Sequence, residues 1–156
     1  MKSHPQYKIC LDAGSGIGPK RPAPNFSAYC DVIIPKPGDI VPENYHVAPL
    51  EDMSCFKDKE FDYIRCHHAL EHCLDPDKAC KEIIRIGKKG LISYPPMWSC
   101  LLFGRKDHLW FMVEDHGRLV FIRKRHPSYG VPRSQVGTEL NRNFAWEGTF
   151  KWLTVT

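Results

Sequence analysis

The stretch KICLDAGSGIGPK, residues 8–20, decides the fold of this chain. A short apolar run leads into Asp12, and glycines follow at positions 14, 16 and 18. This order is typical of a buried strand that ends in a turn whose bare backbone can lie against a ligand. The dinucleotide fingerprint G-x-G-x-x-G would need a glycine at position 19, where the chain has Pro19, so a nicotinamide or flavin ligand is not favoured.

The size and composition of the chain predict one domain. Its 156 residues can bury a real core but leave no room for a separate substrate domain. No apolar run approaches the roughly 20 residues that span a bilayer, and the first six residues lack the apolar stretch of a signal peptide. We therefore expect a soluble, cytoplasmic protein with no membrane partner. The seven cysteines are odd in number and stand in apolar contexts, which favours reduced core residues over disulfides.

Apolar runs and turn residues predict an alternation of strands and few helices. Prolines crowd the first fifty residues, so the connection after the glycine turn is expected to be a loop or a single turn. Asp75 is expected to cap a helix that begins at Pro76 and ends at Gly87 or Gly90. Further strands are expected over residues 28–34, 45–47, 61–66 and 91–94, with a hairpin over 109–113 and 118–123 and one more strand within 144–155.

These elements predict the α/β class. Strands that are separated by crossovers form an open, Rossmann-like, mostly parallel sheet, and the C-terminal antiparallel hairpin is expected to form its edge, with helices reduced in number. Ligands of such sheets bind at the carboxyl ends of the strands. The glycine turn, Asp31, the region of Glu51 and the residues after Cys66 all fall at those ends.

The middle of the chain has a more specific pattern, PLEDMSCFKDKEFDYIRCHHALEHCLDPDKACKEIIRIGKKGLISYPP over residues 49–96. An acidic pair precedes a phenylalanine turn, and F-D, E-H, a D-P helix start and a strand after K-x-G follow. With the glycine turn as motif I, residues 8–96 resemble the small class I S-adenosylmethionine-dependent methyltransferases, in a minimal form that lacks the first helix. The resemblance implies a single domain over 1–156, with a cofactor-binding core over 8–96 and a hairpin and C-terminal segment over 97–156.

The resemblance also implies which residues surround the methionine part of S-adenosylmethionine. The cofactor carries a cationic sulfonium and ammonium, a ribose diol and an adenine, so its pocket needs carboxylates, a backbone turn and an apolar slot. Asp12 is expected near the ammonium, although a turn-stabilising role fits it equally well. Gly14, Ser15 and Gly16 are expected to let the backbone approach the methionine part.

The adenosine part is expected to meet three acidic residues. Asp31, at the end of the second strand, is our choice for the ribose hydroxyls, and Asp39 is its rival because the register is open. Glu51 and Asp52 match the pair beside the adenine, where a carboxylate accepts from the exocyclic amine. Met53 is expected to cover the ring face.

Cysteines and histidines follow the fourth strand. Cys66 and His67 occupy the position from which family members present a backbone carbonyl to the cofactor's ammonium. His68 is a candidate general base, and it is expected to share one face of a short helix with His72, four residues on. A zinc site made of Cys66, His68, His72 and Cys73 is not favoured, because the C-x-x-C pairs of structural sites are absent. We expect no metal.

The C-terminal third is expected to help bind the methyl acceptor. Trp98, His108 and Trp110 are candidates for its pocket, with His108 a second catalytic candidate. The resemblance implies transfer to a small-molecule or glycan-linked acceptor. An inactive binding or regulatory module of this fold is one alternative. An RNA-directed enzyme is another, because the whole charge excess of +4 lies beyond residue 100, but nucleic-acid binding is not favoured. A homodimer that pairs through the hairpin edge remains open.

Overall fold

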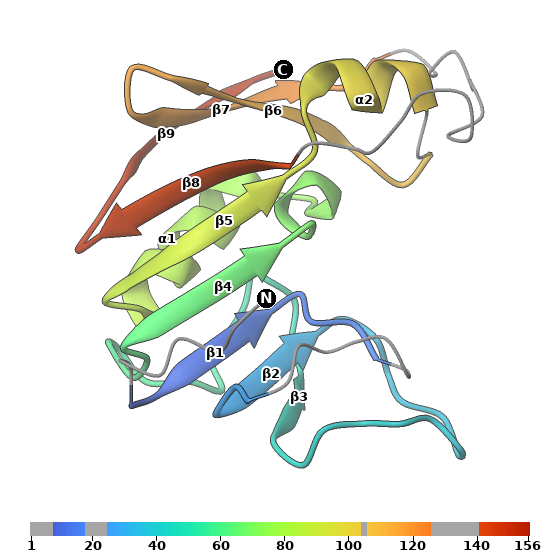
Figure 1. Ribbon diagram of the computed structural model, residues 1–156, viewed down its shortest axis with the longest axis vertical. Coiled ribbons are helices and arrows are strands. Elements are labelled where there is room, and N and C mark those ends of the chain that lie inside the picture. Colours follow the sequence, from blue (N-terminus) through green and yellow to red (C-terminus); the bar gives the residue numbers. More distant parts are fainter. Residues whose placement is uncertain (1–7, 18–24, 104–105, 126–140) are drawn as a thin grey trace.

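The computed structural model describes residues 8–17, 25–103, 106–125 and 141–156 and contains two sheets (Figure 1). The larger sheet has six strands in the order β3-β2-β1-β4-β5-β8, of which the first five are parallel and β8 is antiparallel to β5. Its strands are β1 (Cys10–Ala13), β2 (Ala28–Asp31), β3 (Tyr45–Val47), β4 (Tyr63–His67), β5 (Lys89–Tyr94) and β8 (Arg142–Glu147). The predicted Rossmann-like, mostly parallel α/β sheet is confirmed.

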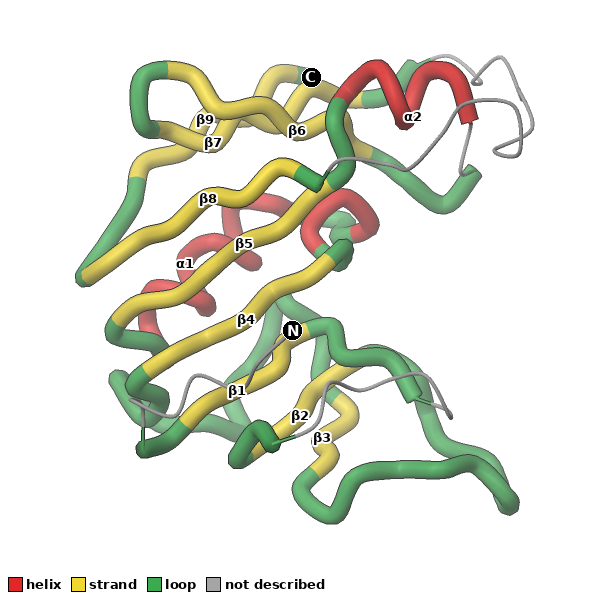
Figure 2. The backbone as a smooth tube through the Cα atoms, in the orientation of Figure 1, coloured by secondary structure: helices red, strands yellow, loops and turns green. Residues whose placement is uncertain are grey.

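The strand order places a switch point beside β1. The chain runs from β1 to β2 and β3 on one side, then returns to β4 and β5 on the other. The segments that leave the carboxyl ends of these strands gather at one edge of the sheet (Figure 2). Open α/β sheets bind ligands at such a point.

Helix α1 (Pro76–Ile86) covers one face of this sheet, behind the strands in Figure 1. Asp75 caps it by accepting a hydrogen bond from the Lys78 amide, and Pro76 occupies its first turn, as predicted. Its apolar side packs on the sheet face that carries Leu11 and Ile64. The helix ends at Ile86, directly before Gly87.

The smaller sheet has the order β6-β7-β9. Strands β6 (Trp110–Asp115) and β7 (Arg118–Arg123) form the predicted antiparallel hairpin, and β9 (Lys151–Val155) is parallel to β7. The hairpin was expected at the edge of the main sheet, and this expectation is wrong because β8 takes that place. The expected single strand within 144–155 is two strands in two sheets, since the chain turns at Gly148.

Other boundaries differ modestly from the expectation. Strand β2 ends at Asp31, three residues before the predicted end, and helix α2 (Met97–Phe103) was not predicted. The connection after the glycine turn lies partly outside the described residues. Six of the seven cysteines are buried and all seven are free thiols. No helix in the described part of the chain is long and apolar enough to cross a membrane.

Candidate functional site

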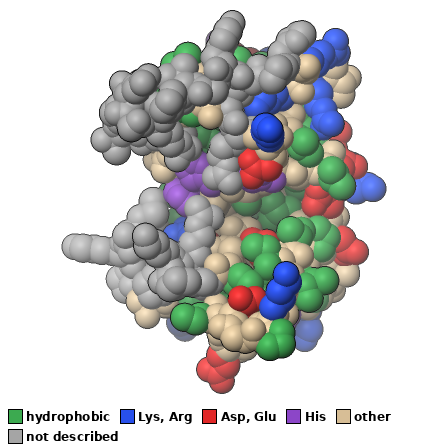
Figure 3. Space-filling view, turned by 90° about the vertical axis from the view of Figure 1, so that its right-hand side faces the viewer, with side chains coloured by type: hydrophobic (Ala, Val, Ile, Leu, Met, Phe, Trp, Pro, Cys, Tyr) green, Lys and Arg blue, Asp and Glu red, His purple; other side chains and the backbone are tan. Residues whose placement is uncertain are grey.

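A pocket of about 750 Å³ opens at the carboxyl ends of the parallel strands. It is lined by the turn after β1, by residues that follow β2, β3 and β4, by the segment that leads into α1, and by Asp107. Figure 3 looks onto this side of the molecule and shows histidine side chains grouped at mid-height. The lining residues are Gly14, Gly16, Asp31, Val32, Ile33, Ala48, Pro49, Leu50, Glu51, His68, Ala69, His72, Cys73, Leu74, Asp75, Lys78 and Asp107.

The glycine turn is held against β2. The amides of Gly14 and Ser15 donate to the Cys30 carbonyl at 2.8 and 3.1 Å. Gly14 and Gly16 have positive φ angles of 71° and 67°, which favour glycine. A Cβ atom on Gly14 would also overlap the Cβ of Ala69. Ser15 is buried beside them and donates its hydroxyl to the Gly16 carbonyl, but it is outside the lining.

Of the two rival acids, the structure brings Asp31 to the pocket. Its Oδ2 accepts from the Gly16 amide at 2.8 Å and its Oδ1 from the Ile33 amide at 3.2 Å, so the carboxylate joins the glycine turn to the end of β2. Asp39 instead caps an exposed turn by accepting from the Lys36 amide at 2.7 Å. It is absent from the lining.

Only one member of the expected acidic pair reaches the pocket. Glu51 lines it, and its Oε1 accepts from the Leu74 amide at 2.6 Å. Asp52 is exposed and outside the lining, and hydrogen bonds from Ser54 lower the pKa of its carboxyl. Met53 is fully buried, with its sulfur 3.8 Å from the Cys30 sulfur, so it is a core residue rather than a cover for the pocket.

The apolar walls of the pocket were missed by the sequence analysis. Val32 and Ile33 follow Asp31 directly. Leu50 lies in the connection from β3 to β4, and Leu74 lies in the connection from η1 to α1. The run after Asp31 was interpreted as a longer strand, although its exposed apolar side chains belong to the loop beyond β2. The sequence signal that could have indicated this wall is an acidic residue at the end of a strand followed directly by apolar residues.

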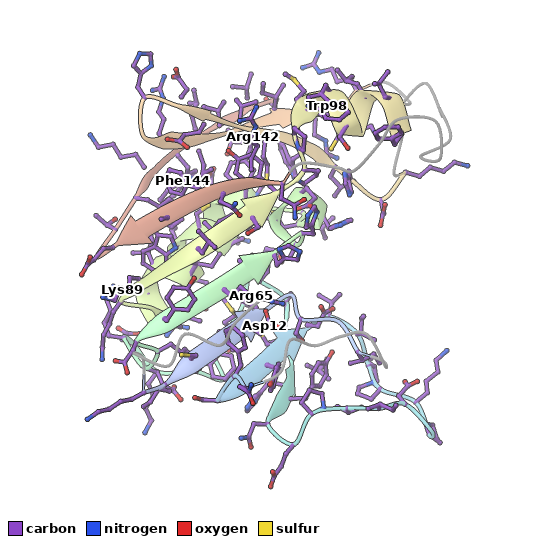
Figure 4. The ribbon with its side chains drawn as sticks, viewed as in Figure 1. Asp12, Arg65, Lys89, Trp98, Arg142 and Phe144 are labelled. Atoms are coloured by element: carbon purple, nitrogen blue, oxygen red, sulfur yellow. The ribbon has the colours of Figure 1, made fainter. Side chains whose placement is uncertain are left out.

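Asp12 is not brought to the pocket. Its carboxylate forms a two-bond ion pair with Arg65 on the neighbouring strand, with Nε to Oδ1 at 2.7 Å and Nη2 to Oδ2 at 2.9 Å (Figure 4). Side chains alternate along a strand, so Asp12 faces away from α1 while Leu11 and Ala13 face the core. The carboxylate is fully buried, and Phe26 lies 5.4 Å from the guanidinium of Arg65.

The cysteines of the disfavoured zinc set are core residues. Cys66 and Cys73 are both buried, and burial raises the pKa of each thiol, which opposes the thiolate that zinc binds. Cys66 and His67 end β4, just before the lining begins at His68. The ring of His67 lies 4.5 Å from that of His68.

His68 and His72 both line the pocket, but not as one helical face. The short helix η1 (Leu70–His72) is a 3-10 turn, and His68 precedes it with a φ of 52°, so the expected shared face is wrong. The Nδ1 of His68 lies 3.2 Å from Oε1 of Glu71, and its Nε2 lies 2.9 Å from Oδ1 of Asn141. The Nδ1 of His72 lies 2.9 Å from the Asp107 carbonyl oxygen.

The three expected acceptor residues lie outside the lining. His108 is buried one layer behind His72, with 4.7 Å between ring centres and its Nδ1 3.3 Å from the Cys100 sulfur. Trp110 is a core residue that donates from Nε1 to the Cys73 carbonyl at 2.8 Å. Trp98 lies on α2, partly exposed (Figure 4).

An open, mostly parallel sheet with a glycine turn at its switch point and an acid at the end of the next strand is typical of folds that bind nucleotide-type cofactors. A family model described as "Methyltransferase domain" matches residues 11–93, more than half of the chain. The chain belongs to the class I S-adenosylmethionine-dependent methyltransferases, and it is therefore an enzyme that uses S-adenosylmethionine to methylate an acceptor. A search of curated proteins found no match.

Proposed function

We propose that this methyltransferase binds S-adenosylmethionine in the pocket at the switch point and methylates a small-molecule or glycan-linked acceptor beside His68. One observation carries the proposal: the same pocket is lined by the glycine turn, by Asp31 and by two imidazoles. Cofactor groups and acceptor groups therefore share one space. Its volume, about 750 Å³, lies within the range of small-molecule sites.

The donor set of the pocket fits the adenosine part of the cofactor. Asp31 holds the glycine turn through one hydrogen bond to each oxygen, and each carboxylate oxygen has a further lone pair for a ribose hydroxyl. Val32, Ile33 and Leu50 give an apolar slot for the adenine. Glu51 stands beside this slot, where it accepts from the exocyclic amine.

The methionine part fits the glycine turn. Because Gly14 and Gly16 have no side chain, the backbone there can approach a ligand that a Cβ atom would exclude. Asp12 is expected to contribute indirectly. Its ion pair with Arg65 joins β1 to β4 and so holds the glycine turn in place, and its carboxylate does not contact the ammonium.

The histidine side of the pocket is assigned to the acceptor. Bound S-adenosylmethionine supplies an electrophilic methyl group: for a hydroxyl acceptor the oxygen gains the bond to carbon, the methyl–sulfur bond leaves its electron pair on sulfur, and the proton passes to solvent. The His68 ring, whose Nε2 lies 2.9 Å from Oδ1 of Asn141, lines this side of the pocket and orients the acceptor by packing against it. Alignment of the reacting atoms supplies much of the rate in such transfers.

Turnover on acceptors of different classes tests this proposal. S-adenosylhomocysteine is measured by mass spectrometry after incubation with S-adenosylmethionine and a sugar, a phenol, an amine or a short RNA. We expect product with a sugar or phenol, and a lower kcat with unchanged cofactor affinity in His68→Gln. Product with RNA alone would establish the RNA-directed alternative. Cofactor binding without product from any acceptor would favour the inactive module.

A further inference from the structure

Three metal-binding side chains converge next to the pocket. Glu71 and His72 come from η1, and His108 comes from the segment just before β6. One ligand atom from each lies within 4.8 Å of the others. Ligands of a tetrahedral zinc ion are about 2.0–2.2 Å from the metal, so an ion would draw these atoms together by a little over 1 Å.

Glu71 is the observation that points to a cation. Its side chain is 1% exposed, and neither carboxylate oxygen has a hydrogen-bond partner among the described residues. Nδ1 of His68 lies within ion-pair distance of Oε1, at 3.2 Å, but without hydrogen-bond geometry, so the remaining lone pairs of the carboxylate are still unsatisfied. Removing a carboxylate from water without hydrogen bonds is costly, so such a group is paired or coordinates a metal.

The surroundings of the two imidazoles suit metal ligation. The Nδ1 of His72 is placed to donate to the Asp107 carbonyl at 2.9 Å, which leaves the lone pair on Nε2. The Nδ1 of His108 lies 3.3 Å from the Cys100 sulfur, a contact that fixes the orientation of its ring. Metal-binding histidines are oriented by such contacts from the second ring nitrogen.

We propose that Glu71, His72 and His108 bind a divalent transition-metal ion, and that the oxygen of a hydroxyl acceptor completes its coordination. Two imidazoles and one carboxylate leave at least one position open, as in catalytic zinc sites. Because His72 also lines the pocket, the site borders the acceptor side. The inference rests on the proposed function and replaces our expectation of no metal.

The ion gives the hydroxyl acceptor a route to deprotonation. A metal ion lowers the pKa of an oxygen that coordinates it, so the hydroxyl releases its proton to solvent before or during the transfer. The oxygen then provides the electron pair for the new bond to carbon, and the metal ion is neither oxidised nor reduced. An amine acceptor, which is nucleophilic without help, has no need of the ion.

Cobalt(II) binding tests the site without any dependence on turnover. The full chain is stripped with a chelator, titrated with Co²⁺ while its visible absorption is followed, and then challenged with Zn²⁺. We expect one equivalent of Co²⁺, displacement by Zn²⁺ and no effect of Mg²⁺. Glu71→Gln and His72→Gln are expected to weaken binding by about 100-fold or more.

His116→Gln is the matched control, since it removes an imidazole from an exposed turn. It is expected to bind Co²⁺ like the wild type, and circular dichroism checks that each variant is folded. Absence of stoichiometric Co²⁺ binding by the wild type overturns the proposal, as does equal binding by Glu71→Gln, His72→Gln and the wild type.

Two further readouts separate this inference from the proposed function. Calorimetry of the stripped protein with S-adenosylmethionine tests cofactor binding alone. Absence of binding would refute the proposed cofactor pocket, and the Co²⁺ titration would still test the metal site independently. Product formation from a hydroxyl acceptor is expected to disappear on stripping and return with Zn²⁺. Undiminished transfer to that acceptor by the stripped enzyme overturns the metal's role.

Discussion

At the scale of single residues, Gly14 stands where both the backbone and a neighbour exclude a side chain. Its φ is 71°, and a Cβ atom would overlap that of Ala69. Gly117 has a similar φ of 74° but open space around it. We predict that Gly14→Ala lowers the free energy of unfolding, measured in urea, by clearly more than Gly117→Ala, which carries only the left-handed cost of about 1–2 kcal/mol. Equal losses would show that the overlap is relieved without cost.

The ion pair of Asp12 and Arg65 is the second prediction at this scale. Both side chains are largely buried, so Asp12→Ala leaves a guanidinium without its partner and is expected to cost about 3–5 kcal/mol of unfolding free energy. Asp115→Ala, which breaks the exposed pair with Arg118, is expected to cost under about 1 kcal/mol. A similar loss in the two variants would contradict the buried-pair account.

At the scale of elements, α1 anchors the loop that carries Glu51. Glu82 accepts from the Met53 amide at 2.8 Å, and Arg85 donates to the carbonyls of Met53 and Phe56 at 3.0 and 2.9 Å. The loop between β3 and β4 is therefore fixed to the helix. This contact was not predicted, because charged residues on an amphipathic helix are usually interpreted as its solvated side.

Acid unfolding tests this anchor. The hydrogen bonds from Arg85 lower the pKa of Glu82, so its contribution is complete above the ordinary glutamate pKa and is lost as the pH falls through the lowered value. Glu82→Gln is expected to cost about 1–2 kcal/mol at pH 7, and this difference from the wild type is expected to shrink below about pH 4. Exposed Glu43→Gln is the control. A difference that does not change with pH would contradict the anchor.

Element prediction from the sequence succeeded where local signals were complete. Asp75, Pro76 and Gly87 mark both ends of α1, and its apolar period is helical. The prediction failed where a strand is defined by the strand that it pairs with rather than by its own residues. Residues 142–155 contain two short strands whose assignment to different sheets depends on contacts with β5 and β7, far away in the sequence. Helix α2 was missed because nearly all of its seven residues are apolar, so its sequence shows no helical alternation of apolar and polar residues.

At the scale of the whole molecule, the thiols report how completely the core is closed. Burial raises the pKa of Cys30 to about 12, and the other buried cysteines are also shielded, whereas Cys55 is exposed. We predict that one thiol per folded chain reacts with Ellman's reagent, that Cys55→Ser abolishes this reaction, and that denaturant exposes the other six. Rapid reaction of several thiols in the native protein would show a looser core.

The site could be predicted only in part. The spacing of residues shows which of them lie near the ends of strands, but it does not show which side chains point into the pocket and which into the core. Asp31, Glu51 and the glycine turn lie at strand ends, and the pocket contains them. Asp12 and Met53 have the right place in the sequence but point elsewhere, the first to Arg65 and the second into the core. The approach of His108 to Glu71 and His72 depends on the second sheet, which no local pattern places.

The central claim is that the cofactor binds where Asp31 joins the glycine turn. Calorimetry with S-adenosylmethionine on the wild type, Asp31→Asn and Asp39→Asn, with NAD as the control ligand, tests it most directly. The account predicts binding of S-adenosylmethionine but not of NAD, a loss of about tenfold or more in Asp31→Asn, and no change in Asp39→Asn. Unchanged affinity in Asp31→Asn, or a loss confined to Asp39→Asn, would contradict it.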